Sequence, residues 1–141
     1  MDLVEKKKNL GRNITLFSAL ILIIGSVLPV AGFKNISVYG LEGDGRITVT
    51  LGLLIIASTF LKKIPKYTNT IFAALALALA TFDYSKLHES TSAIKSTVST
   101  NTYMIDVAST IEIGYGLQLV ILGAIGAIAG SIIDMLQNKR A

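Results

Sequence analysis

The sequence has no cysteine and only one histidine among its 141 residues. Without cysteine, the chain can form neither disulfides nor thiolate metal sites, and it has no thiol nucleophile. His88 has no second imidazole with which to share a metal ion, so it is expected to be a solvated surface residue. No Ser-His-Asp set or catalytic carboxylate pair is recognisable. The chain is therefore not expected to be an enzyme, and no catalytic residue, cofactor or metal site is predicted.

Charged side chains are missing from four long stretches of the chain. A helix of about 20 apolar residues, rising roughly 1.5 Å per residue, crosses a hydrocarbon core of about 30 Å. With 52% hydrophobic residues and a mean hydropathy of +0.63, the composition indicates an integral membrane protein. The apolar runs, whose interiors contain no Asp, Glu, Lys, Arg or His, are Ile14 to Phe33, Ile47 to Leu61, Ile71 to Phe82 and Ile113 to Ile133.

The predicted fold is an all-α membrane protein, a bundle of four transmembrane helices in one domain. Pro29, near the outer end of the first run, is expected to bend that helix or begin its exit. A re-entrant hairpin is the rival interpretation of the two shorter middle runs, but its basic tip around Lys66 would be costly to bury in lipid. The domain covers 1–141, with spans at about 14–33, 46–62, 67–83 and 113–134 and outer segments at 34–45 and 84–112.

Basic residues gather before the first span, in the turn between the middle spans and after the last span. The positive-inside rule places these three regions, and hence both termini, in the cytoplasm. This distribution explains the net charge of +4 by orientation and attraction to anionic lipid, so no nucleic-acid partner is expected. A cleaved signal peptide is the alternative for the first run, but a signal core of about 7 to 15 residues is shorter than this run.

The first outer segment combines a strand pattern with a glycine-rich turn. Ile36 and Val38 alternate with polar neighbours, which predicts a short strand at 35–39. Asp44 is expected to cap the second span, with its carboxylate accepting amides of the first helical turn. A calcium site is the weaker alternative, because only Glu42 lies nearby. Asn35 begins a glycosylation sequon and is a possible modification site.

The second outer segment is predicted to extend the third helix beyond the membrane, from Tyr84 to about Ser99, because apolar residues recur at helical spacing. From 105 to 113 the apolar residues fall at odd positions, which indicates an extended return to the last span. Pairing of this return with the strand at 35–39 would form a small hairpin-like sheet and satisfy backbone groups of both outer segments.

Small residues in two spans predict close helix packing, because helices in lipid associate through backbone approach. The last span contains Gly126 and Gly130 at small-xxx-small spacing, preceded by Gly123, and the third span includes Ala76 and Ala80. Two alternatives are open for these five residues. They pack within one bundle, or they also form a contact between protomers of a homo-oligomer.

Two glycine motifs carry a resemblance. Gly43-Asp44-Gly45 ends the first outer segment, and Gly114-Tyr115-Gly116-Leu117 opens the last span. In these motifs the chain resembles small, largely uncharacterised four-span membrane proteins of bacteria and archaea, over most of its length, and the resemblance implies the topology alone. The arrangement is also similar in outline to claudin-like tetraspans. This chain lacks the long first loop and the paired cysteines of claudins, so no claudin function is implied.

The functional hypothesis is a non-enzymatic membrane scaffold or accessory subunit that acts by helix packing and outer-segment contacts. Its expected partners are the lipid bilayer and either a second copy of the chain or another membrane protein. The alternative is a small oligomeric pore or transporter. Transport usually requires ionisable or strongly polar groups at membrane depth, and the polar residues within the runs, such as Ser26, Thr48 and Gln118, are common in ordinary helix packing.

Overall fold

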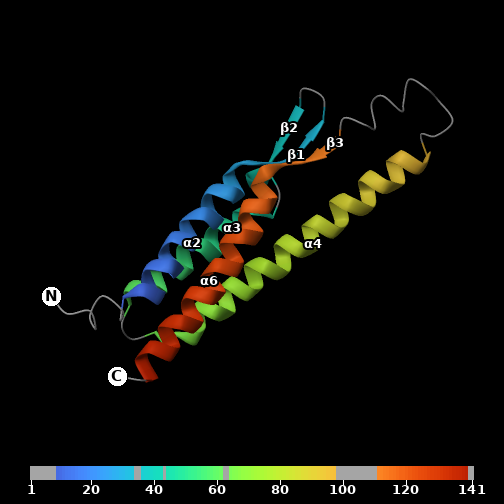
Figure 1. Cartoon of the computed structure of the whole chain (residues 1–141). Coiled ribbons are helices and arrows are strands. Elements are labelled where there is room, and N and C mark those ends of the chain that lie inside the picture. The colour runs from blue at the N-terminus through green and yellow to red at the C-terminus, as the bar shows by residue number, and fades with distance from the viewer. Residues whose placement is uncertain (1–8, 34–35, 43, 62–63, 98–110, 140–141) are drawn as a thin grey trace.

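The computed structural model of the chain describes residues 9–33, 36–42, 44–61, 64–97 and 111–139. In these ranges, four α-helices form a bundle with a three-stranded sheet at one end (Figure 1). The chain is thus mostly helical, as predicted. The elements are α2 (Leu10–Val27), β1 (Pro29–Phe33), β2 (Ile36–Tyr39), the 3-10 turn η1 (Gly40–Glu42), α3 (Gly45–Phe60), α4 (Tyr67–Thr97), β3 (Ile111–Ile113) and α6 (Tyr115–Lys139).

Three helical segments are long and apolar enough to cross a membrane: Leu10–Val27, Tyr67–Ala93 and Tyr115–Gln137. The remaining helix, α3, is also apolar but has only 16 residues. These helices make the chain compatible with a membrane protein.

The prediction that the first apolar run forms one helix up to residue 33 is wrong. α2 ends at Val27, and Leu28 already has an extended backbone with φ −72° and ψ 161°. The next residue is Pro29, which disfavours the helical region for its predecessor and has no amide hydrogen to continue the helix. Of the two predicted alternatives at Pro29, a bend or an exit, the chain thus leaves the helix, and the last residues of the run become strand β1.

β1 is the middle strand of an antiparallel sheet with the order β2-β1-β3. Gly32 lies opposite Ser37 of β2 on one side and Glu112 of β3 on the other. A strand is present at 36–39 and another precedes the last helix, but the predicted pairing between these two is wrong. Both pair with β1, because the early end of α2 places an extended segment between them. Residues 105–110 of the predicted return lie outside the described ranges.

α2 and α6 make the most extensive contact between any two helices, and glycines bring their backbones together. A Cβ atom added at Gly123 of α6 would lie 2.6 Å from the backbone nitrogen of Leu22. One added at Gly25 of α2 would lie 2.7 Å from the backbone nitrogen of Val120. Since Cβ atoms essentially never approach below 3.0 Å, neither helix has room for a side chain at these positions.

The distribution of side chains is the reverse of that in a water-soluble bundle. Small and hydroxyl-bearing residues make up most of the interior, beside a few aliphatic side chains such as Leu22 and Ile55, while large apolar side chains lie on the outside of each helix. This arrangement fits helices that pack through small residues and are surrounded by lipid. The buried residues include Thr15, Ser18, Ala19, Ser26, Ala73, Ala76, Ala80, Ala124, Ala127 and Ser131, and the exposed ones include Phe17, Leu20, Ile24, Leu53, Phe60, Ile71, Leu75, Phe82, Leu122, Ile125 and Leu136.

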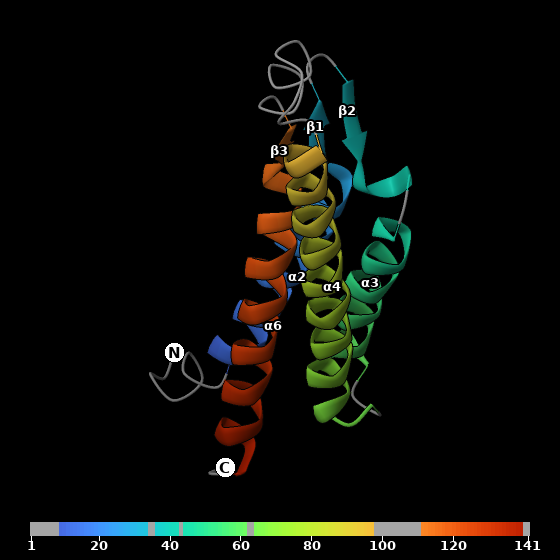
Figure 2. The ribbon, with the colours of Figure 1, turned by 90° about the vertical axis from the view of Figure 1, so that its right-hand side faces the viewer.

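Hydrogen bonds attach the start of α4 to its neighbours. Asn69 is buried; its Nδ2 donates to Thr59 Oγ1 at 3.1 Å, and its Oδ1 accepts from the hydroxyl of Ser58. The hydroxyls of Thr70 and Ser131 lie 2.8 Å apart and join α4 to α6. Figure 2 shows α4 crossing between α6 and α3, the two helices that it contacts.

An ion pair marks the same end of the bundle. Lys66, in the turn before α4, places its Nζ 2.7 Å from Oδ2 of Asp134 in α6. Gly11, near the start of α2, packs against the backbone of the same Asp134. The start of α2, the turn before α4 and the end of α6 therefore lie together, opposite the sheet (Figure 1). We call this end of the bundle the Lys66 end.

The glycine contact between α2 and α6 gives a stability prediction. Gly123→Ala should lower the free energy of unfolding by about 1–3 kcal/mol, because the added methyl group meets the backbone of Leu22 and forces the helices apart. Gly32→Ala is the matched control, since a Cβ there has nothing within 4 Å. Denaturant unfolding in detergent, followed by circular dichroism, measures both; equal stability of the two variants would contradict the proposed role of the close contact.

Candidate functional site

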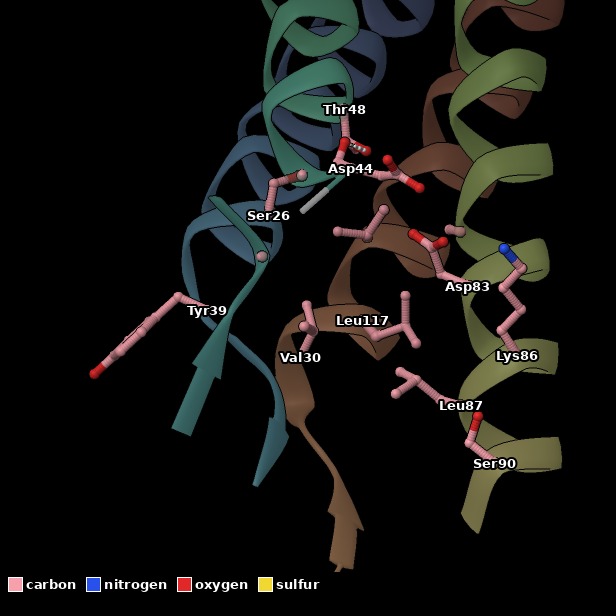
Figure 3. Close-up of a pocket in the computed structure, with 14 residues that line it drawn as sticks. Ser26, Val30, Tyr39, Asp44, Thr48, Asp83, Lys86, Leu87, Ser90 and Leu117 are labelled. Atoms are coloured by element: carbon pink, nitrogen blue, oxygen red, sulfur yellow. Dashed lines mark hydrogen bonds between the residues drawn. The ribbon is translucent and has the colours of Figure 1, made fainter. Parts of the chain in front are cut away.

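A cavity of about 310 Å³ lies between α4 and the rest of the bundle, next to the sheet (Figure 3). It exists because α4 is attached at the Lys66 end and runs away from α2 and α6 towards the sheet (Figure 1). Its walls come from α2, β1, β2, η1, α3, α4 and α6. Segments from most of the chain therefore contribute to one site.

Most of the cavity wall is apolar. The aliphatic side chains come from β1, α4 and α6, and in Figure 3 Val30, Leu87 and Leu117 lie close together on one side of the cavity. Tyr39 also borders the cavity, but its ring points away from it. The apolar wall can hold a hydrocarbon group. Its members are Val30, Ala80, Leu87, Leu117 and Val120.

Two buried hydroxyl groups also line the cavity. Ser26 Oγ donates to the carbonyl of Leu22 at 2.8 Å, and Thr48 Oγ1 donates to the carbonyl of Asp44 at 3.3 Å. Both hydroxyl hydrogens are thus used within the protein. The oxygen lone pairs of Ser26 and Thr48 are left to accept hydrogen bonds, so these groups favour a ligand that donates.

The charged groups of the cavity are Asp44, at the start of α3, and Asp83 and Lys86, on α4. In Figure 3 the two carboxyl groups point toward one another across the gap between α3 and α4. Two carboxylates placed in this way repel each other when both are ionised. Asp83 is half-buried, whereas Asp44 is exposed, so the pair lies at the mouth of the cavity.

Lys86 balances only part of this charge. It is the cation that acts on Asp83, and its Nζ lies 4.5 Å from the centre of the Phe82 ring, within the range of a cation–π contact. Two carboxylates and one ammonium leave one negative charge when both acids are ionised. The cavity can therefore accept one positive charge, either a proton or a cationic group.

Asp44 occupies the N-cap position of α3, as predicted, but the predicted use of its carboxylate is wrong. The side chain makes no capping hydrogen bond. Its backbone carbonyl instead accepts from the amides of Ile47 and Thr48. The carboxylate is turned away from the helix end and towards Asp83, because α4 lies beside this turn and lines the cavity with it.

The predicted packing residues lie in two places. Gly123, Gly126 and Gly130 all face α2, where they approach Leu22, Ser18 and Thr15 respectively. Ala76 and Ala80 belong to the buried core, together with Leu22, Leu51, Leu117, Val120 and Ala124. Of the five predicted packing residues, only Ala80 also borders the cavity. The possible glycosylation site, Asn35, lies outside the described residues.

The sequence alone does not single out Asp83 and Lys86 as site residues. A signal for Asp83 is nevertheless present, because Ala76, Ala80, Asp83 and Leu87 follow one another at helical spacings of four, three and four residues. Such positions share one face of a helix. Once the helix is taken to continue beyond Phe82, this spacing places Asp83 on the same face as the buried alanines.

Within the described ranges, no three His, Cys, Asp or Glu residues come together as a possible metal site. Comparison of the chain with protein-family models, with curated proteins and with solved structures finds no match. The resemblance to small four-span proteins stays a prediction.

The carboxyl pair predicts an unusual stability change. Asp83→Asn should raise the free energy of unfolding by up to about 1 kcal/mol, because the amide removes one like charge and can donate a hydrogen bond to the Asp44 carboxylate. Lys86→Gln should lower stability, since it leaves the two acids without their nearby cation. Thermal unfolding in detergent at neutral pH measures both. The interpretation fails if Asp83→Asn is as destabilising as Asp134→Asn, which breaks the ion pair with Lys66.

Proposed function

We propose that the chain is a four-span membrane protein, with both termini in the cytoplasm, that acts as a non-enzymatic scaffold or accessory subunit. It works by helix packing and by contacts of its outer segments with another membrane protein or a second copy of itself. The argument has three parts: the number of spans, their orientation and the surface left for a partner.

The fourth span is the short helix α3. Its 16 residues measure about 24 Å, a little less than a hydrocarbon core of about 30 Å. A small mismatch of this kind is met by local thinning of the bilayer or by the flanking residues. α3 packs against α2 and α4, and its exposed apolar side chains, Ile47, Leu53 and Phe60, run from its start to its end. These features support a helix that crosses the same bilayer as its neighbours.

The orientation follows from the two ends of the bundle. By sequence, basic residues precede α2, precede α4 and follow α6, and these three ends of helices meet at the Lys66 end. The end with the sheet carries Asp44 and Asp83 beside Arg46 and Lys86. The positive-inside rule therefore supports a cytoplasmic Lys66 end and an outer sheet.

The observation that carries the proposed function is the length of α4. Its 31 residues measure about 46 Å, so about 10 residues extend past a span of about 20. From Tyr84 to Ser92 the side chains are exposed except for Leu87 and Thr91, which are half-buried. Figure 1 shows this part of the helix standing away from α2 and α6. It presents a polar helical surface to a partner outside the membrane.

A second candidate function, a small oligomeric pore or transporter, is favoured by the pair of carboxyl groups at Asp44 and Asp83. Ionisable groups within the membrane region commonly mark ion or substrate paths. The pair borders a cavity near the outer end of the helices. A transporter requires a second conformation in which this cavity continues towards the Lys66 end. A scaffold has no such requirement.

Orientation can be tested with single cysteines in this cysteine-free chain. Ser92 and Pro65 are both exposed and lie at opposite ends of α4. In intact cells, a membrane-impermeant maleimide should label Ser92→Cys but not Pro65→Cys, while lysed cells should label both. Labelling of Pro65→Cys in intact cells would contradict the cytoplasmic Lys66 end.

Reconstituted vesicles separate the two candidate functions. The scaffold predicts that liposomes containing the protein are no more permeable to protons, Na⁺ or small amines than empty liposomes. The fluorescence of pH-sensitive and Na⁺-sensitive dyes trapped inside the vesicles measures this. Flux above the empty vesicles that Asp83→Asn removes would favour the transporter instead.

A further inference from the structure

We propose that the cavity between α4 and the sheet binds a small organic monocation, a primary ammonium group carried on a short aliphatic chain. The scaffold function requires no ligand. The proposed binding site and the proposed scaffold function are therefore independent of each other.

The size and lining of the cavity set the first requirement. Its volume of about 310 Å³ lies at the small end of ligand sites, which typically measure about 300–1,000 Å³. Val30, Leu87 and Leu117 supply an apolar surface on one side. A hydrated inorganic ion would leave this surface without a partner, whereas a chain of a few methylene groups would cover it.

The charged groups set the second requirement. Asp44 and Asp83 face one another and carry one negative charge more than Lys86 can balance. An ammonium group between the two carboxylates would balance this negative charge. It would also donate to both acids through charge-assisted hydrogen bonds, which are stronger than bonds between neutral groups. An anionic ligand would be repelled by the excess negative charge of the two carboxylates.

The third requirement is a place for the remaining ammonium hydrogen. An ammonium group has three donors and no acceptor. The hydroxyl oxygens of Ser26 and Thr48 line the same cavity and have already donated their hydrogens within the protein, so they are available as acceptors. The donors and acceptors of the ligand and the site are therefore complementary.

Two sources can supply this chemistry: a water-soluble amine and the headgroup of an aminophospholipid. The cavity lies at the end of the helices with the sheet, where lipid headgroups of the outer leaflet would be found under the proposed orientation. Both sources place an ammonium group next to a hydrocarbon chain, and the experiment below distinguishes them.

The probe is 6-fluorohexylammonium, and its neutral control is 6-fluorohexanol. Each is titrated into the full chain in nanodiscs of phosphatidylcholine, with binding followed by the ¹⁹F signal of the probe. Empty nanodiscs give the background from partition into lipid. Saturable binding of the amine above this background, with none for the alcohol, is the expected result.

The variants give changes of opposite sign. Asp83→Asn should weaken binding of the amine roughly tenfold, because it removes one of the two carboxylates. Lys86→Gln should strengthen binding roughly fivefold, because it removes the competing positive charge. Asp134→Asn, at the Lys66 end, is the matched control and should change nothing. A general loss of structure cannot strengthen binding, so the Lys86 variant keeps the test valid even if Asp83→Asn folds poorly.

Replacing phosphatidylcholine with phosphatidylethanolamine identifies the source. If the probe no longer binds in these nanodiscs, the lipid headgroup occupies the site. If binding is unchanged, the site takes a soluble amine. Equal binding of amine and alcohol, or an amine affinity that neither Asp83→Asn nor Lys86→Gln alters, would overturn the proposed site. Neither of these results would affect the flux and labelling tests of the scaffold.

Discussion

The close contact between α2 and α6 is the constraint on which the rest of the structure depends. Glycines on both helices bring their backbones together, and each lies against the other along most of its length. β1 follows α2 directly and β3 directly precedes α6, so the two strands leave the same end of this helix pair side by side. The sheet is thus a continuation of the helix contact, and β2 adds to its free edge.

The cavity is a second consequence of the same helix pair. With α2 and α6 in close contact, α4 packs against α6 and α3, and hydrogen bonds from Asn69 and Thr70 attach its start to these two helices. Its far half diverges, and side chains fill the gap incompletely. Polar attachment at one end and separation at the other explain why a charged site occurs beside an otherwise apolar bundle.

The apolar runs, the extension of the third helix past Phe82 and the strand at 36–39 could be predicted from the sequence, because each depends on local periodicity. The fate of residues 29–33 could not. Pro29 is compatible with either a bend or an exit, and only pairing with β2 and β3 makes the segment a strand. The same holds for Asp44. Its position at the start of α3 can be predicted from the local sequence, but the direction of its carboxylate depends on where α4 lies in the fold.

The α2–α6 contact also bears on how the protein is made. Thr15 and Gly130 touch, although 115 positions separate them in the sequence. During synthesis α2 is translated first and α6 last, so the principal interface has no partner until nearly the whole chain has been translated. Contacts of such high sequence separation slow folding and prolong exposure of incomplete states. Chains that stop before α6 would leave the glycines and buried hydroxyl groups of α2 without their partner helix.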